Sequence, residues 1–580
     1  MKKIKKGRLA IVSILVIVAA LSFAFLTSQE TRDFRIAKNL DIFFSMFREL
    51  NTFYVDEINP DKIIKTGIDD MLKSLDPYTV YYPESEIDEF TFMTTGKYGG
   101  IGSMVRNNGD YAVITQVYKG FPADLAGIKP GDIIKKVDGI SLKGLVTDKV
   151  SEKLKGDPGT PITLTVERNG KESDYSMKRE RIAVPPVPYY GMIDSKTGYI
   201  RFTTFTVNCI EEVRKAVVAL KEQNPQSIIL DLRSNLGGLL EEAVEIVNLF
   251  VGPGTEVVST KGKVKQFDSD YKTTKNAIDE TIPLAVIINR SSASASEIVA
   301  GAIQDLDRGV IIGQRSYGKG LVQTVRPLSY NTQLKVTTAK YYIPSGRCIQ
   351  ALDFSHPNED GSVGVIPDSL ISEFKTRNGR TVKDGGGITP DIDVQVETLS
   401  QLATELYLRN FIFDFASQYY WSHPDIKTPG QFKFTDQDYS DFKSFINSKN
   451  FNYRTITEQS FSELVSNAKR EKYYDMHKDL FTALEKDIAH DLNEDLVTFK
   501  SEILELIEDE IMGRYFYEDG AIKWTLKTDE QVLKAVDVLN NKELYNSILN
   551  GKSGAILVTS INKNISASGK TDTKRHQRLI

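Results

Sequence analysis

Short apolar runs typical of buried strands alternate with helical segments between residues 198 and 313. The strand-like runs are residues 227–232, 284–289 and 310–313, and the helical segments are residues 239–250 and 297–306. Neighbouring parallel strands need long connections, which crossover helices supply. The alternation therefore predicts a largely parallel sheet built from βαβ units, to which residues 337–343 add a further strand.

The sequence patterns on either side of this segment differ from it and from each other. At about 150 residues per domain, its length corresponds to roughly three or four domains. We expect a multidomain α+β protein of 580 residues with these parts: 1–28, a signal anchor or signal peptide; 34–92, a helical cap; 93–185, a β-rich module; 186–395, an α/β core; 396–550, a helical region; and 551–580, a loose tail.

Composition limits the functions that are open to the chain. The 73 Lys and Arg against 78 Asp and Glu give a net charge of −5, and a pI of about 5.8 argues against nucleic-acid binding. Cys209 and Cys348 lack the spacing of a zinc site or a disulfide framework, although one bridge between them stays open. All five histidines lie at or after His356, so the preceding chain must do its chemistry without histidine.

The N-terminus has the pattern of an export signal. A basic cluster within residues 2–8 precedes the uncharged apolar run 9–26, which as a helix would span roughly 27 Å. We expect an uncleaved anchor in the cytoplasmic membrane, with cleavage after residues 22–24 as the alternative. The remainder would then lie on the periplasmic or extracytoplasmic side of the cell envelope.

Residues 289–298, Asn-Arg-Ser-Ser-Ala-Ser-Ala-Ser-Glu-Ile, join an apolar strand to a helix. A serine hydroxyl at such a turn lies at the carboxyl edge of the sheet, where a helix N-terminus favours developing negative charge. The alternative is a capping box, in which Ser294 only accepts a backbone hydrogen bond and Glu297 completes the pair. The spacing alone does not separate Ser294 from Ser292 or Ser296.

A serine nucleophile needs a base, and lysine is the alternative to histidine. Lys319 lies in Gly-Lys-Gly between two apolar strands, where close backbone packing could bury its amine and so keep it neutral. The competing interpretation is a surface-turn lysine. The turn 231–238, Asp-Leu-Arg-Ser-Asn-Leu-Gly-Gly, exposes backbone amides that could hold an oxyanion, or it is an ordinary packing turn.

Taken together, these segments resemble the tail-specific or C-terminal processing serine peptidases. The resemblance extends from about residue 34 to residue 395 and includes Gln323, residues 338–346 and residues 387–391. It implies Ser294 as nucleophile, Lys319 as general base and Gln323 as the residue that orients the lysine. It also implies oxyanion amides at Gly237 and Ala295, and no metal or organic cofactor.

The β-rich module resembles a PDZ domain through residues 122–134, Pro-Ala-Asp-Leu-Ala-Gly-Ile-Lys-Pro-Gly-Asp-Ile-Ile. The resemblance implies a carboxylate-binding loop formed by Tyr98, Gly99, Gly100, Ile101 and Gly102. Free amides in such a loop capture a terminal carboxylate while the peptide adds as a strand to the sheet edge.

We therefore expect an exported serine endopeptidase that recognises polypeptides with apolar C-termini and uses a Ser-Lys dyad. Two alternatives remain: an inactive or partner-gated PDZ scaffold that only binds peptides, and a triad hydrolase that recruits His356. Residues 396–580 have no assigned role, and a homodimer or an adaptor protein stays open as a partner.

Overall fold

The structure is a computed structural model that describes residues 32–354, 363–396, 398–424 and 426–551. The chain separates into two compact units, residues 1–81 and 82–580. The first contains a helix over residues 32–53 and helix α2, Pro60–Lys73. Asn59 caps α2, because its side chain accepts a hydrogen bond from the N–H of Lys62.

The apolar run 9–26 and its expected role as a signal or anchor lie outside the described residues. Among the helices that the structure does describe, none combines the length and the apolar character needed to cross a membrane.

The second unit begins with a short helix and a strand-rich module. Helix α3, Ile87–Thr95, leads into strand β2, Lys97–Gly100, which pairs antiparallel with β9, Glu180–Ala183. The module's sheet has the order β3-β4-β5-β7-β8, with β6 paired to β5. Its elements are β3 Ser103–Asn108, β4 Tyr111–Val117, α4 Pro122–Leu125, β5 Ile133–Val137, β6 Ile140–Ser141, α5 Thr147–Leu154, β7 Pro161–Arg168 and β8 Lys171–Lys178.

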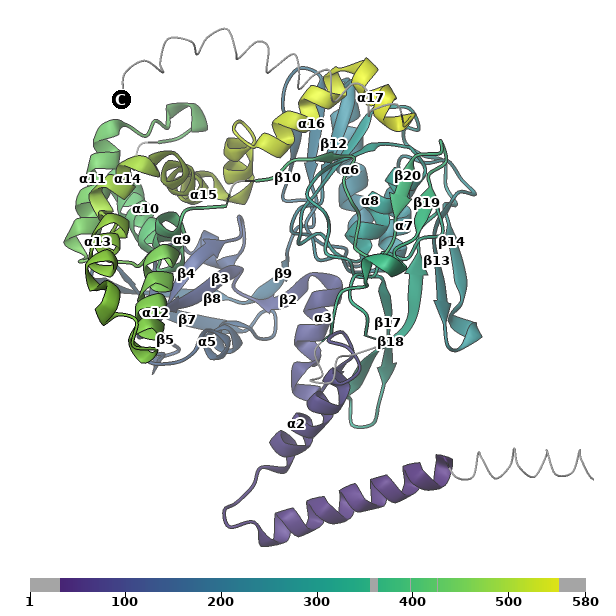
Figure 1. Cartoon of the computed structure of the whole chain (residues 1–580), viewed down its shortest axis with the longest axis horizontal. Coiled ribbons are helices and arrows are strands. Elements are labelled where there is room, and N and C mark those ends of the chain that lie inside the picture. The colour runs from purple at the N-terminus through teal and green to yellow at the C-terminus, as the bar shows by residue number, and fades with distance from the viewer. Residues whose placement is uncertain (1–31, 355–362, 397, 425, 552–580) are drawn as a thin grey trace, which may run out of the picture. The chain divides into compact units, whose positions relative to one another are not determined.

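The predicted βαβ alternation is present in a six-stranded sheet of order β10-β11-β12-β15-β16-β21 (Figure 1). All neighbouring pairs from β11 to β21 are parallel, and β10 is antiparallel to β11. The elements are β10 Tyr189–Met192, β11 Thr197–Arg201, α6 Cys209–Lys221, β12 Ser227–Asp231, α7 Leu240–Asn248, β15 Leu284–Ile288, α8 Ala295–Asp305, β16 Val310–Gly313 and β21 Ile392–Asp393.

A second sheet lies beside this one in the core. Strand β18, Gln333–Tyr342, pairs with β17, Leu321–Pro327, and with β13, Glu256–Gly262, which in turn pairs with β14, Ser269–Lys272. The strand expected at residues 337–343 is the second half of β18. Two short strands, β19 Glu373–Lys375 and β20 Thr381–Lys383, form a separate hairpin.

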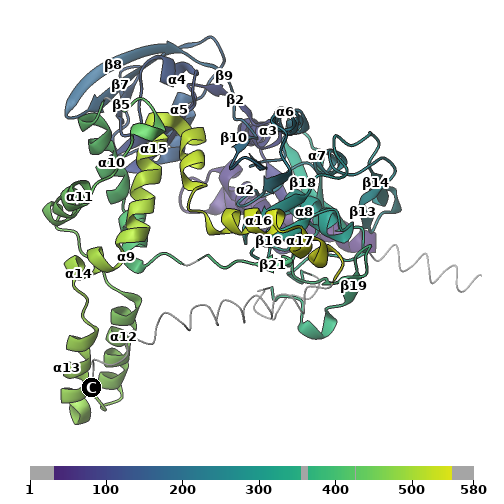
Figure 2. The same ribbon diagram turned by 90° about the horizontal axis from the view of Figure 1, so that it is seen from above.

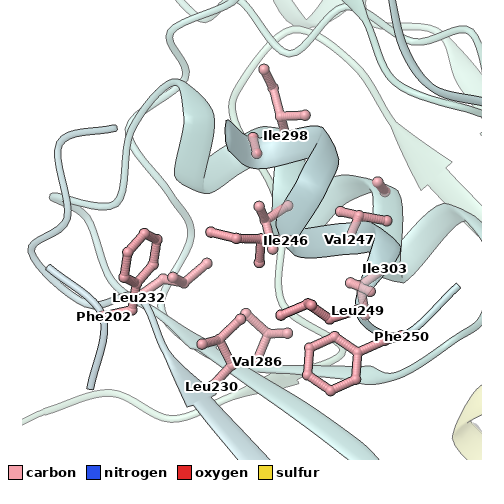
Figure 3. Packing of buried hydrophobic residues seen from close by; sticks show 14 of the residues in the cluster. Phe202, Leu230, Leu232, Ile246, Val247, Leu249, Phe250, Val286, Ile298 and Ile303 are labelled. Atoms are coloured by element: carbon pink, nitrogen blue, oxygen red, sulfur yellow. The ribbon is translucent and has the colours of Figure 1, made fainter. Parts of the chain in front are cut away.

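The parallel sheet is buried on both faces. On one face, side chains of α6, α7 and α8 pack against alternate strand residues such as Leu230 and Val286 (Figure 3). On the other face, Ile229 and Ile287 pack against α16, Glu530–Asn540, and α17, Lys542–Leu549. Both views place α16 and α17 against the core (Figures 1 and 2). Helices α16 and α17 therefore supply the second layer that a parallel sheet needs.

Helices α9 Gln401–Leu408, α10 Phe411–Ser422, α11 Asp436–Ser448, α14 Leu492–Thr498 and α15 Lys500–Thr525 contribute to a separate apolar core. Helices α12, Ile456–Arg470, and α13, Lys478–Ile488, pack against each other (Figure 2). Helix α15 is kinked at Phe516 and Tyr517, and Tyr517 adopts φ +58°. The hydroxyl of Tyr517 donates to Asp124 of the strand-rich module at 2.8 Å.

Candidate active site

The strand-to-helix turn between β15 and α8 carries Ser294. This residue is the N-cap of α8 and has φ +58° and ψ −114°, a backbone conformation that is strained for any residue except glycine. Ser292 and Ser296 are fully buried, and their hydroxyls donate to the carbonyls of Leu232 and Asn235. Only Ser294 among the three is partly exposed, so geometry separates it from its neighbours as spacing could not.

Gly237 lies directly against this turn. It has φ +93°, and a Cβ atom at this position would lie 2.8 Å from the backbone nitrogen of Ala295 and 2.8 Å from Cβ of Ser294. The amide of Ala295 belongs to the first turn of α8, where N–H groups have no acceptor within the helix. The amide of Gly237, by contrast, already donates to Oδ1 of Asn235 at 2.9 Å. An oxyanion could therefore accept from the Gly237 amide only by sharing its hydrogen with Oδ1 of Asn235 or by displacing that oxygen.

Asp231 is the first residue of the turn 231–238, which carries Gly237. Its fully buried carboxylate pairs with Arg201 and Arg233 and accepts from the hydroxyl of Tyr199 at 2.6 Å. Burial alone would raise the pKa of Asp231, but the charges of Arg233 and Arg201 outweigh it and lower the pKa to about 2. Asp231 is thus a structural anion that fixes the strand end.

Lys319 follows β16 in a loop whose backbone is tied to the serine turn. The side chain is partly buried. Its backbone N–H donates to Oε2 of Glu297 at 2.9 Å, and the N–H of Ser294 donates to the same oxygen at 2.8 Å. The other oxygen, Oε1, accepts from the hydroxyl of Ser316 at 2.6 Å and the N–H of Gly318 at 2.7 Å.

Glu297 is therefore the residue that joins the two loops. Its carboxyl is completely buried, and this burial, only partly offset by the four donors, raises its pKa to about 7. The sequence predicted only the capping-box hydrogen bond to Ser294. The capping-box spacing was the one signal available, because the donors at residues 316, 318 and 319 arrive from a distant loop.

Tyr341 on β18 makes a second connection between the loops. Its buried hydroxyl donates to the carbonyl of Lys319 and lies 3.2 Å from the carbonyl oxygen of Ser294. Gln323 lies nearby on β17, where its amide donates to the Leu321 carbonyl and to Oγ1 of Thr337, each at 3.3 Å. The structure thus brings together the segments that carry Ser294, Ala295, Gly237, Lys319 and Gln323.

The expected carboxylate-binding loop divides into two parts. Tyr98, Gly99 and Gly100 lie in β2 and pair with β9, so only Ile101 and Gly102 lie outside a strand. The carbonyl of Gly99 accepts from the N–H of Gly156. The strand that follows, β3, is terminal in the order of its sheet.

Other residues considered from the sequence do not join this site. Cys209 and Cys348 are free thiols rather than a bridge, and Cys209 donates to Glu242. His356 lies outside the described residues. Across residues 32–354, 363–396, 398–424 and 426–551, no three His, Cys, Asp or Glu side chains form a group that could hold a metal ion.

Comparison with known proteins gives matches to three families along the chain. Residues 196–370 match the model of peptidase family S41, residues 113–168 that of a PDZ domain, and residues 402–539 that of the C-terminal helical domain of probable PDZ-proteases. The carboxy-terminal-processing protease of Bartonella bacilliformis is 35% identical over 342 residues, which are 58% of this chain and 76% of that protein.

Two further similarities involve part of the chain. A probable CtpA-like serine protease of Staphylococcus aureus is 34% identical over 371 residues, which are 62% of this chain and 71% of that protein. A solved structure titled photosystem II D1 C-terminal processing protease is 27% identical, with a TM-score of 0.35, over 61% of this chain and 87% of its own.

Proposed function

The chain belongs to the carboxy-terminal-processing proteases of peptidase family S41 with a PDZ domain, and on this premise we propose that it cleaves polypeptides with a Ser294–Lys319 dyad. The observation that supports the dyad is the carboxylate of Glu297, one oxygen of which accepts from the N–H of both residues. This shared acceptor ties the backbones of the two loops together.

In the proposed reaction, the neutral amine of Lys319 takes the proton of the Ser294 hydroxyl as its oxygen attacks the scissile carbonyl. The oxyanion that forms lies toward the amides of Ala295 and Gly237. Lys319 then gives the proton to the leaving amine, and an acyl-enzyme remains. Water, deprotonated by the same amine, releases the acyl group and restores both residues.

We assign Gln323 the role of positioning the side chain of Lys319. We assign the PDZ domain the role of binding substrate C-termini. A peptide would add to the terminal strand β3, with its carboxylate at the amides of Ile101 and Gly102. Ile101, Val150 and Leu154 belong to the buried apolar core of this module, and a peptide side chain that entered between β3 and α5 would meet that core, which suits an apolar C-terminus.

We further propose that the enzyme is exported and held in the cytoplasmic membrane by residues 9–26. A protease added to intact spheroplasts should then degrade the chain from outside, whereas a cytoplasmic enzyme in the same cells stays intact. Protection of the chain under these conditions would contradict export.

The dyad is tested with the full-length chain and an unfolded polypeptide that ends in an apolar tail. Ser294→Ala and Lys319→Ala should each abolish cleavage, as read by mass spectrometry, while Ser291→Ala and Lys340→Ala, which alter exposed residues, should cleave as the wild type does. The same polypeptide ending in two aspartates should be cleaved slowly. Full activity in either dyad variant would refute the proposal.

A further inference from the structure

Two large apolar side chains are exposed on the loops that flank Ser294. Leu236, in the turn after β12, is 73% exposed, and Tyr317, in the loop after β16, is 48% exposed. The strand order β12-β15-β16 places these two loops on opposite sides of the turn that follows β15 and carries Ser294. The proposed nucleophile therefore lies between one exposed leucine and one exposed tyrosine.

Leu236 is fixed by the residues on either side of it. Asn235 is fully buried, and its side-chain amide donates to the carbonyl of Phe202 at 3.0 Å. The N–H of Gly237 donates to Oδ1 of Asn235, and its carbonyl accepts from the N–H of Phe205. Both neighbours of Leu236 are thus hydrogen-bonded to the core, and the leucine is exposed on a turn with a fixed backbone.

Tyr317 is fixed in a similar way. Its own N–H donates to the carbonyl of Ser292 at 3.0 Å. Its neighbours Ser316 and Gly318 are buried, and both donate to the carboxylate of Glu297. A single exposed apolar residue is common on a protein surface. Here, however, each of two fixed loops beside the nucleophile exposes one, which indicates that both have a common ligand.

The proposed reaction assigns each of these side chains to one side of the scissile bond. The oxyanion is the carbonyl oxygen of the substrate residue before the bond. That residue therefore lies at the amides of Gly237 and Ala295, next to Leu236. The leaving amine, which receives the proton from Lys319, belongs to the residue after the bond. That residue therefore lies on the side of the lysine loop, which carries Tyr317.

The geometry of an extended peptide fits this arrangement. Successive side chains of an extended chain point to opposite sides of its backbone. In a substrate bound at Ser294, the side chain before the scissile bond and the side chain after it would therefore face different loops. The turn after β12 and the loop after β16 are two such loops, and each offers one apolar side chain.

From the exposure, the fixed backbones and the strand order, we propose that Leu236 and Tyr317 determine which peptide bond is cleaved. Leu236 contacts an apolar substrate side chain before the bond, and Tyr317 contacts an apolar side chain after it. The preferred site is thus a pair of consecutive apolar residues in an unfolded polypeptide. This inference rests on the proposed Ser294–Lys319 dyad, and it concerns the residues at the cut rather than the C-terminal tail that the PDZ domain would bind.

The test uses the full-length chain and four fluorogenic peptides. The peptides share one apolar C-terminal tail and differ only at two adjacent central positions, each of which holds leucine or serine between glycines. For the wild type, leucine should raise kcat/KM about 10-fold over serine at each position, as expected for contact with one apolar side chain. Mass spectrometry identifies the bond that is cleaved.

The variants separate the two contacts. Leu236→Ser should lower only the preference before the bond, to under about 2-fold, and Tyr317→Ser only the preference after it. Leu236→Met and Tyr317→Phe keep an apolar surface and should keep both preferences. Leu480→Ser and Tyr473→Ser are matched controls, because these residues are 70% and 57% exposed on or beside α13, outside the peptidase core. Each preference is a ratio within one variant, so a loss of folded protein cancels.

The outcomes distinguish this inference from the proposed function. If the wild type cleaves, Ser294→Ala does not, and both preferences are unchanged in Leu236→Ser and Tyr317→Ser, the dyad stands and this inference is wrong. A reversed assignment, in which Leu236→Ser changes only the preference after the bond, would also overturn it. A wild type that cleaves neither the peptides nor an unfolded polypeptide would refute the proposed function, and this inference with it.

Discussion

Replacing Glu297 with glutamine is the sharpest test of how the site is held together. The glutamate offers two acceptor oxygens to four donors: Ser294, Ser316, Gly318 and Lys319. Glutamine has the same shape but only one acceptor oxygen, and its other terminal atom is an N–H₂ group. Two buried donors therefore lose their acceptor and face a second donor.

The size of the effect follows from this count. A buried donor left without an acceptor costs about 1–3 kcal/mol, so two cost about 2–6 kcal/mol. This is a large share of the total stability of a typical domain, which is about 5–15 kcal/mol. Because one oxygen fixes the backbone of both Ser294 and Lys319, we also expect their spacing to relax, and a shift of about 1 Å can lower the rate about 100-fold.

The assay compares urea unfolding and kcat/KM at pH 8 for the wild type, Glu297→Gln and Glu242→Gln. Glu242 is the matched control, since its carboxylate accepts from the backbone N–H of Asn208 and Ile210 at the start of α6. Glu242→Gln should lose stability but keep kcat/KM once folded. A Glu297→Gln protein with the wild-type kcat/KM and free energy of unfolding would refute the reasoning.

Three further predictions concern a glycine and two buried charged groups of the core. Gly237→Ala should lower kcat at least 100-fold, because the added Cβ would lie 2.6 Å from the carbonyl oxygen of Ala293. Gly254→Ala is the control and should keep its activity, since Gly254 also has positive φ but its added Cβ would meet no atom within 4 Å. Equal activity of the two variants would contradict the close packing at Gly237. Arg233→Met leaves the buried Asp231 short of one cation and should cost about 3–5 kcal/mol in urea unfolding; a cost under about 1 kcal/mol would contradict this. Because the pKa of Glu297 rises from 4.5 unfolded to about 7 folded, its contribution to stability is complete below about pH 4.5 and is lost as the pH rises to about 7, by roughly 3 kcal/mol. Unfolding free energies measured across this range should show the loss in the wild type and not in Glu297→Gln; parallel curves would rule it out.

Much of the fold could be predicted because its signals are local. The strand at 310–313 has the predicted bounds, and helix α8 begins two residues before the predicted start because Ser294 is its cap. The strand expected at 337–343 exists, but its sheet could not be predicted. It pairs with β13 and β17, and those partners are chosen by packing that no local pattern encodes.

In the candidate site, too, some features follow from local sequence signals and others only from tertiary packing. The turn at 231–238 and the turn at 289–298 both come after strands, β12 and β15, that are adjacent and parallel, so their proximity follows from the predicted topology. The hydrogen bond from Gly237 to Asn235 and the contacts of Tyr341 could not be predicted in the same way. Each depends on the direction of one side chain in the folded core.

The two-sided burial of the parallel sheet explains why the C-terminal helices belong with the core. Strand β12 is buried at every position, so its sequence requires apolar cover on both faces. Helices α6, α7 and α8 cover only one face. The other is covered by α16 and α17, about 140 residues beyond the last strand, and the ion pair between Arg233 and Asp529 joins the start of α16 to the turn that follows β12. The turn that carries Gly237 is thus stabilised from the far end of the chain, which is a physical reason for the helical region to be part of the same protein as the peptidase core.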